Sequence, residues 1–182
     1  MQDSLKGITG QVRLMQHKVS RFGLFVLKVL DLFRAENLRQ MYVQRFGVLM
    51  LDTGFIKNTI TNASFAVLSG LAGNTGAQTA FTYLAVGTSN TAASASQTAL
   101  GGEIVDSGLQ RAAATVSRVT TTQTNDTLQL SKAFTVTGTK TVEEIGIFNA
   151  SSSGTMLGRA LTGTQSLVNG SVITLVYKVK FA

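Results

Sequence analysis

Short segments that alternate apolar and polar side chains follow one another from residue 81 to the end of the sequence. Such alternation places the apolar side chains on one face of a β-strand. The last segment is the clearest, with Ile173, Leu175, Tyr177, Val179 and Phe181 on one face. Repeated short strands separated by turn residues predict a mainly β fold, an antiparallel β-sandwich of about seven or eight strands.

The other expected strands cover residues 80–86, 100–105, 112–122, 128–136, 142–149 and 156–161. Before them, residues 56–71 carry apolar side chains at helical spacing, and glycines and an asparagine then end the pattern. Residues 37–52 fit either a helix or a strand, because periodicity does not decide the conformation of a short apolar run.

Apolar residues between positions 8 and 33 are spaced alternately by four and three residues, which is the heptad pattern of a coiled coil. β-Branched residues at the second apolar position of the heptad favour three or more helices. The sequence therefore predicts an N-terminal helix that forms an oligomer or anchor interface, with a trimer preferred. The expected interface residues are Ile8, Val12, Met15, Val19, Phe22, Val26, Val29 and Phe33.

Three uses of this helix remain open: association of copies, docking into a different protein, or packing on the β-domain of the same chain. The second half of the segment is apolar nearly all round, which is typical of a helix buried on several sides. We expect two regions, a helical arm over residues 1–53 and a β-sandwich domain with a short leading helix over residues 54–182.

The chain has one histidine, no cysteine and no tryptophan, which argues against an enzyme. His17 lies between Gln16 and Lys18, so we expect it on an exposed helix face. Glu143 and Glu144 point to opposite faces of a strand and do not act on one bond together. We expect Glu143 at the surface and Glu144 as the partner of a buried arginine or of backbone groups. We predict no catalytic residues, no metal site and no cofactor.

The net charge is +7, although charged residues make up only 14% of the chain. Residues 1–54 contain eight basic and four acidic residues. So few charges leave neutral surface that favours burial against partners. The aromatic residues among the basic ones fall on the apolar stripe, so we do not expect nucleic-acid binding. We do not expect membrane binding either, although residues 18–34 keep the pattern of a basic amphipathic helix that can lie in a membrane interface. We expect neither a secretory signal nor a membrane span.

Five phrases occur in a fixed order in the second part of the chain, and a β-strand follows them. They are Ile56–Asn62, Phe81–Thr88, Thr98–Leu100 with Glu103, Glu144–Ala150 and Gly154–Ala160. In this order, the phrases resemble a group of tailed-bacteriophage structural proteins described as tail fibre, tail-collar or related virion proteins. The resemblance covers about residues 54–182.

The resemblance implies a virion component with a small β-sandwich, assembled in the host cytoplasm and in contact with tail, collar or capsid subunits. Fibre, collar, adaptor, baseplate and capsid decoration remain open as its place. A receptor- or carbohydrate-binding module at a fibre tip is the alternative of a different class. The loops at residues 89–98 and 151–154 are small and chemically plain, which argues against that alternative.

Overall fold

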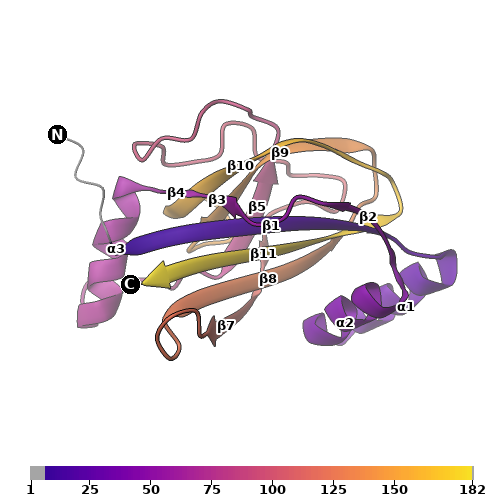
Figure 1. Cartoon of the computed structure of the whole chain (residues 1–182), viewed down its shortest axis with the longest axis horizontal. Helices are drawn as coiled ribbons and strands as arrows, with labels where there is room; N and C mark the ends of the chain where they lie inside the picture. The colour runs from indigo at the N-terminus through magenta and orange to yellow at the C-terminus, as the bar shows by residue number, and fades with distance from the viewer. Residues whose placement is uncertain (1–6, 182) are drawn as a thin grey trace.

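A computed structural model describes residues 7–181, which form two antiparallel sheets and three helices (Figure 1). The first sheet has six strands in the order β2-β1-β11-β8-β7, with β3 also paired to β1. The strands of this sheet are β1 (Ile8–Lys18), β2 (Val48–Asp52), β3 (Ile56–Lys57), β7 (Thr115–Val119), β8 (Thr127–Thr135) and β11 (Ser171–Phe181).

The second sheet has five strands in the order β4-β10-β9-β5-β6. Its strands are β4 (Thr59–Ile60), β5 (Tyr83–Gly87), β6 (Ala112–Ala113), β9 (Lys140–Phe148) and β10 (Met156–Leu167). Buried side chains from both sheets share one core, because alternate residues of each strand point toward the other sheet. Leu14 and Leu175 come from the first sheet, and Leu84, Ile145 and Leu157 come from the second.

The expectation of a mainly β fold with antiparallel strands is confirmed, with eleven strands among the described residues rather than seven or eight. Most of the expected strands are present. The segment 100–105 is an exception, because it makes only an isolated bridge between Glu103 and Gly87. The expected helix at residues 56–71 begins later, as α3 (Asn62–Gly73), after the short strands β3 and β4.

The predicted helix over residues 8–33 is wrong in its first half, because residues 8–18 form β1. This strand lies between β2 and β11 and pairs with β11 along its whole length, from Ile8 opposite Phe181 to Lys18 opposite Ser171. A spacing of four residues lies on one face of a helix and also on one face of a strand. Ile8 and Val12 therefore fit both structures, and pairing with β11 decides between them.

Residues 7–53 are consequently not a helical arm that is separate from the β-domain, and residues 1–6 of that predicted arm lie outside the described residues. Val12 and Leu14 on β1 are fully buried in the shared core. His17 also lies on β1 and is buried, so the expected exposed helix position is wrong. Burial lowers the pKa of His17, against a smaller opposite influence of Asp52.

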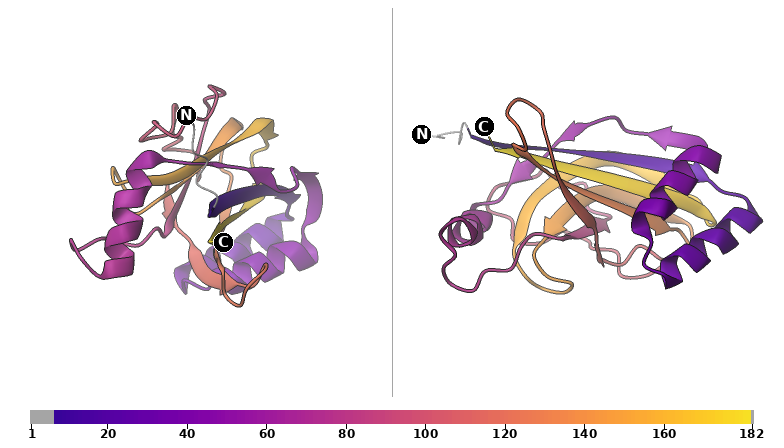
Figure 2. Two further views of the ribbon diagram at one scale, coloured as in Figure 1. Left: turned by 60° about the vertical axis from the view of Figure 1, so that its left-hand side comes forward. Right: turned by 90° about the horizontal axis from the view of Figure 1, so that it is seen from below.

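Two helices follow β1: α1 (Arg21–Leu32) and α2 (Glu36–Phe46). The helix α1 begins where the Ser20 hydroxyl accepts a hydrogen bond from the Gly23 N–H at 3.0 Å. Residues 37–52, which fitted either conformation, contain both: residues 37–46 belong to α2 and residues 48–52 form β2. The pair α1–α2 lies at one end of the molecule, and α3 lies at the other end (Figures 1 and 2).

Candidate assembly surface

The outward face of α1 is apolar. Phe22, Phe25 and Leu32 are 72%, 62% and 80% exposed, and Val29 and Phe33 are also exposed. The positions 22, 25, 29 and 32 recur at the spacing of one helix face. The opposite face is buried through Gly23 and Leu27, so α1 carries apolar side chains both toward the protein and toward solvent.

Exposed apolar side chains also occur on α2 and β2. Twelve of the seventeen large apolar side chains that are exposed in residues 7–181 lie between residues 22 and 55, so they are concentrated on one part of the molecule. A concentration of this kind marks an interaction site in a folded protein. We call the following residues the hairpin surface: Phe22, Phe25, Val29, Leu32, Phe33, Leu38, Met41, Phe46, Val48, Leu49 and Met50.

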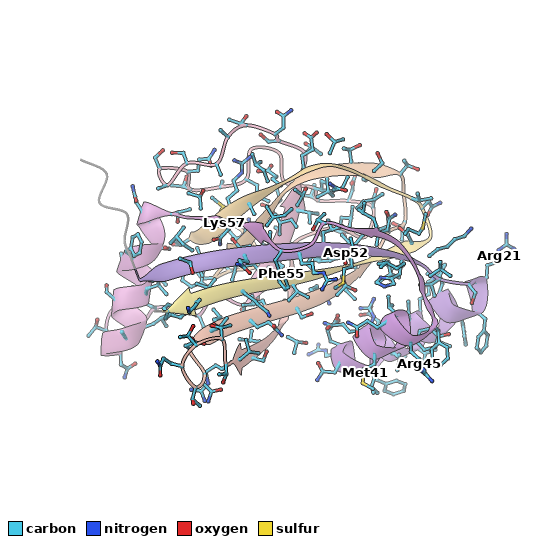
Figure 3. All side chains as sticks on the ribbon, viewed as in Figure 1. Arg21, Met41, Arg45, Asp52, Phe55 and Lys57 are labelled. Carbon is cyan, nitrogen blue, oxygen red and sulfur yellow. The ribbon has the colours of Figure 1, made fainter. Side chains whose placement is uncertain are left out.

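Five cationic side chains surround the hairpin surface. Lys18, Arg21, Lys28, Arg34 and Arg45 are exposed, and none of them makes an ion pair with another residue in the range 7–181. Figure 3 shows Arg21 and Met41 directed away from the sheets. The surface therefore combines exposed apolar groups with uncompensated positive charge.

The acidic residues of α1 and α2 do not pair with these five cations. They bind other residues of the protein and so hold the helices in place. Glu36 accepts hydrogen bonds from the Lys132 ammonium and from the Ala133 N–H, both at 2.9 Å, which fixes α2 to β8. Burial opposes ionisation of Glu36, but these hydrogen bonds outweigh it and keep its pKa below the ordinary value. Asp31 accepts from the buried Arg39 at 2.9 Å.

The eight residues predicted for the interface have different places in the structure. Phe22, Val29 and Phe33 belong to the hairpin surface, whereas Val26 is half-buried on α1. The other four precede α1 and do not share its outward face. Their positions are Ile8 and Met15, which are half-buried, and Val12 and Val19, which are buried.

Sequence reasoning missed most of the hairpin surface, including Phe25, Leu32, Leu38 and Met41. All of these residues are visibly apolar in the sequence. The pattern did not show which apolar residues face solvent, because α1 is apolar on both sides. In the structure, Leu27 of α1 and Val43 of α2 pack against β8 and β11. The opposite face of α1 is therefore the one that is exposed to solvent.

A bidentate ion pair fixes β2, the edge strand beside the hairpin surface. Arg13 on β1 donates from Nε to Asp52 Oδ1 at 2.8 Å and from its terminal nitrogen to Oδ2. The hydrogen bond from Arg13 lowers the pKa of Asp52 from 3.8 to about 2. The charged form of Asp52 is thus favoured in the folded state.

We predict that the Arg13–Asp52 pair makes the free energy of unfolding decrease as the pH falls from about 4 to about 2. Because the folded pKa of Asp52 is depressed, its contribution is present above pH 3.8 and is lost as the pH falls toward 2. In urea unfolding between pH 4 and pH 2, the free energy of unfolding should fall more steeply for the wild type than for Asp52→Asn. Parallel curves would show that the pair contributes nothing to the acid response.

A second polar cluster lies on the face of the second sheet that points away from the shared core. Glu144 on β9 and Arg159 on β10 are fully buried, with Arg159 Nε 2.5 Å from Glu144 Oε2. Glu144 also accepts from the N–H groups of Ser89, Gly101 and Gly102 at 2.8–3.3 Å. The expectation that Glu144 meets a buried arginine or backbone groups is confirmed.

Arg159 completes the cluster by donating to the carbonyl oxygens of Ser89 and Thr91, at 3.2 and 2.7 Å, and to the side chain of Gln97 at 3.2 Å. The pair therefore ties the loop 88–102 across the outer face of the second sheet. Both charged groups are engaged by protein atoms, so the cluster acts as a structural clasp.

Within residues 7–181 there is no group of three or more acidic, histidine or cysteine side chains that could hold a metal ion. The helices described for the chain are all too short or too polar to cross a membrane. Compared with protein-family models, with curated proteins and with solved structures, the chain matches none. Its function is therefore argued from its own surface.

Proposed function

We propose that the chain is a non-enzymatic structural component of a tailed-bacteriophage virion. Its two sheets form a β-sandwich that presents the hairpin surface to a neighbouring virion subunit. The observation that carries this proposal is the concentration of exposed apolar side chains on α1, α2 and β2. Such a surface is stabilised when a partner covers it.

The sequence phrases that resemble virion proteins also support the proposal, because three of them lie next to one another in the fold. Phe81–Thr88 contains β5, Glu144–Ala150 contains most of β9, and Gly154–Ala160 contains the start of β10. These three strands are neighbours in the second sheet, and two of the phrases supply the Glu144–Arg159 pair. Three of the five phrases therefore build neighbouring strands of one sheet.

A tail fibre, collar or adaptor component is the place we favour, and capsid decoration is the alternative. The preference for a trimer depended on a continuous heptad helix, and β1 removes that basis. Association of copies remains a prediction that light scattering of the full chain tests.

We predict that Phe25→Ser combined with Leu32→Ser prevents assembly without unfolding the chain. Both side chains are largely exposed, so their loss leaves the core intact, but it removes apolar area that a partner would cover. The measurement is the amount of the chain in particles purified from the lysate of a host that carries the gene, by quantitative mass spectrometry.

The matched control for this pair is Val105→Ser. Val105 is 72% exposed, as Phe22 is, but lies outside the hairpin surface. We expect the control variant in particles at the wild-type level. Equal amounts of the Phe25→Ser, Leu32→Ser variant and the wild type would show that the hairpin surface is not the assembly contact.

One observation favours a second candidate function, a receptor-binding module. A hollow of about 810 Å³ lies on the outer face of the first sheet beside α2. The ring of Phe55 in this hollow lies 5.7 Å from the Arg13 guanidinium carbon and 4.8 Å from Lys178 Nζ. Exposed amides of Gln44 and half-buried amides of Gln129 also line it.

Arg13 is already paired with Asp52, so Lys178 is the cation of this hollow without an ion pair in residues 7–181. An aromatic ring with such a cation and amides around it fits an acidic saccharide. The site lies on a sheet face and not on the loops at residues 89–98 and 151–154. A glycan array with the wild type and Phe55→Ala tests this candidate. Binding of acidic glycans that Phe55→Ala abolishes would support it, and an array without signal would exclude it.

A further inference from the structure

We infer that the partner of the hairpin surface is a protein other than a second copy of this chain, one that presents an apolar groove bordered by carboxylates. The inference rests on the proposed function and specifies the partner. It follows from the distribution of charge over the described residues.

The charge of the hairpin surface is complementary to negative charge on another molecule. Its five exposed cations, Lys18, Arg21, Lys28, Arg34 and Arg45, have no ion-pair partner in residues 7–181. The nearby acids Asp31 and Glu36 are already engaged by Arg39 and Lys132. A partner that covers the apolar side chains also approaches these cations, and it gains affinity if it brings opposite charge.

Residues 7–181 of a second copy offer little free negative charge, because six of their eight acids form ion pairs within the chain. These six are Asp31, Glu36, Asp52, Glu103, Asp106 and Glu144. Asp126 accepts hydrogen bonds from the N–H groups of Thr121, Thr122 and Gln123 at 2.8–2.9 Å. Glu143 accepts from the Thr164 hydroxyl, so Asp126 and Glu143 are the two acids of residues 7–181 without an ion-pair partner.

Two copies that met through their hairpin surfaces would also place cations against cations. Like charges brought together at an interface disfavour the complex. The arrangement therefore argues against both the symmetric contact and a head-to-tail contact with an acidic patch of the next copy. A different molecule with negative charge fits the surface better.

The apolar side chains indicate a protein among the anionic partners. Phe22, Phe25, Val29 and Leu32 recur at the spacing of the anchors by which an amphipathic helix enters a groove. Nucleic acid offers phosphates and base faces, which would leave the aliphatic Val29 and Leu32 without an apolar contact. A groove bordered by carboxylates satisfies the apolar stripe and the cations together.

The experiment reverses two charges of the hairpin surface, in Arg21→Glu with Lys28→Glu, and measures the chain in purified particles by quantitative mass spectrometry. We expect a loss of about tenfold or more relative to the wild type, because carboxylates would then face carboxylates. The control reverses Lys57 and Arg118 to Glu. These two side chains are exposed, make no ion pair in residues 7–181 and lie outside the hairpin surface, so incorporation should stay at the wild-type level.

Selection for mutations that restore incorporation of the reversed variant identifies the partner protein. We expect second-site changes of Asp or Glu to Lys or Arg in another virion protein. A wild-type chain in particles together with full incorporation of the reversed variant would overturn the inference and leave the proposed function standing. A wild-type chain absent from particles would overturn the proposed function itself.

Two further measurements distinguish the other occupants. In light scattering, the mass of the wild type and of the reversed variant should be the same. An oligomer that dissociates in the reversed variant would overturn the inference in favour of a second copy. Flotation with vesicles of three parts phosphatidylcholine to one part phosphatidylglycerol should show no binding. Binding that the reversed variant loses would overturn it in favour of an anionic lipid surface.

Discussion

A chain that begins at residue 19 should not fold. Such a chain lacks β1, which lies between β2 and β11 and contributes Val12 and Leu14 to the shared core. Its loss removes the backbone partners of β11 along eleven residues and exposes core side chains such as Leu175. Deletion of a single large core side chain costs about 2–5 kcal/mol, and whole domains are stable by only about 5–15 kcal/mol.

A single substitution tests the same point within the full chain. We expect Leu14→Asp to abolish the cooperative unfolding transition in urea, because it places a charge in the core. Thr9→Asp is the control, since Thr9 lies on the same strand but is exposed beside the cationic Lys178 and Lys180. A cooperatively folded chain from residue 19 onward would show that the N-terminal segment is separable from the β-fold after all.

Glu144→Gln should produce the second large effect. The substitution leaves the Arg159 guanidinium fully buried without its counter-charge. Removing one partner of a buried pair destabilises a protein by about 3–5 kcal/mol. Glu143→Gln is a matched control one residue away, on the opposite face of β9, and should change stability by less than about 0.5 kcal/mol.

The same variant should release the loop that the clasp holds. Amide hydrogen exchange of residues 88–102 should become faster in Glu144→Gln than in Glu143→Gln, because Ser89, Gly101 and Gly102 donate to the Glu144 carboxylate. The double variant Glu144→Gln, Arg159→Met should recover part of the lost stability, since it no longer buries a lone charge. Equal stability of Glu144→Gln and Glu143→Gln would show that the Glu144–Arg159 pair does not hold the loop 88–102 in place.

The second half of the fold could be predicted from the sequence because strand alternation there agrees with the final burial. Tyr177 and Val179 alternate with Lys178 and Lys180, and both are buried on the inner face of β11. The role of Glu144 could also be predicted, because a lone carboxylate in an apolar strand requires a partner. In both places, local pattern and tertiary structure favour the same arrangement.

The N-terminal third could not be predicted in the same way. The conformation of residues 8–18 is decided by the strand β11 at the other end of the chain, which a local pattern does not contain. The interface residues Val12 and Val19 were misplaced for the same reason. The hairpin surface depends on which side of α1 meets β8 and β11, and an all-round apolar helix does not encode that choice in its periodicity.

Photo-cross-linking in purified particles tests the central claim most directly. A photoreactive amino acid replaces Phe25 on the hairpin surface or, as the control, Asn74 at the end of α3 on the opposite side of the molecule. We expect irradiation to join position 25 to a different virion protein in high yield, and we expect position 74 to give less of this product. Particles in which position 25 gives no cross-link, while the chain is present and folded, would contradict the claim that the hairpin surface is its assembly contact.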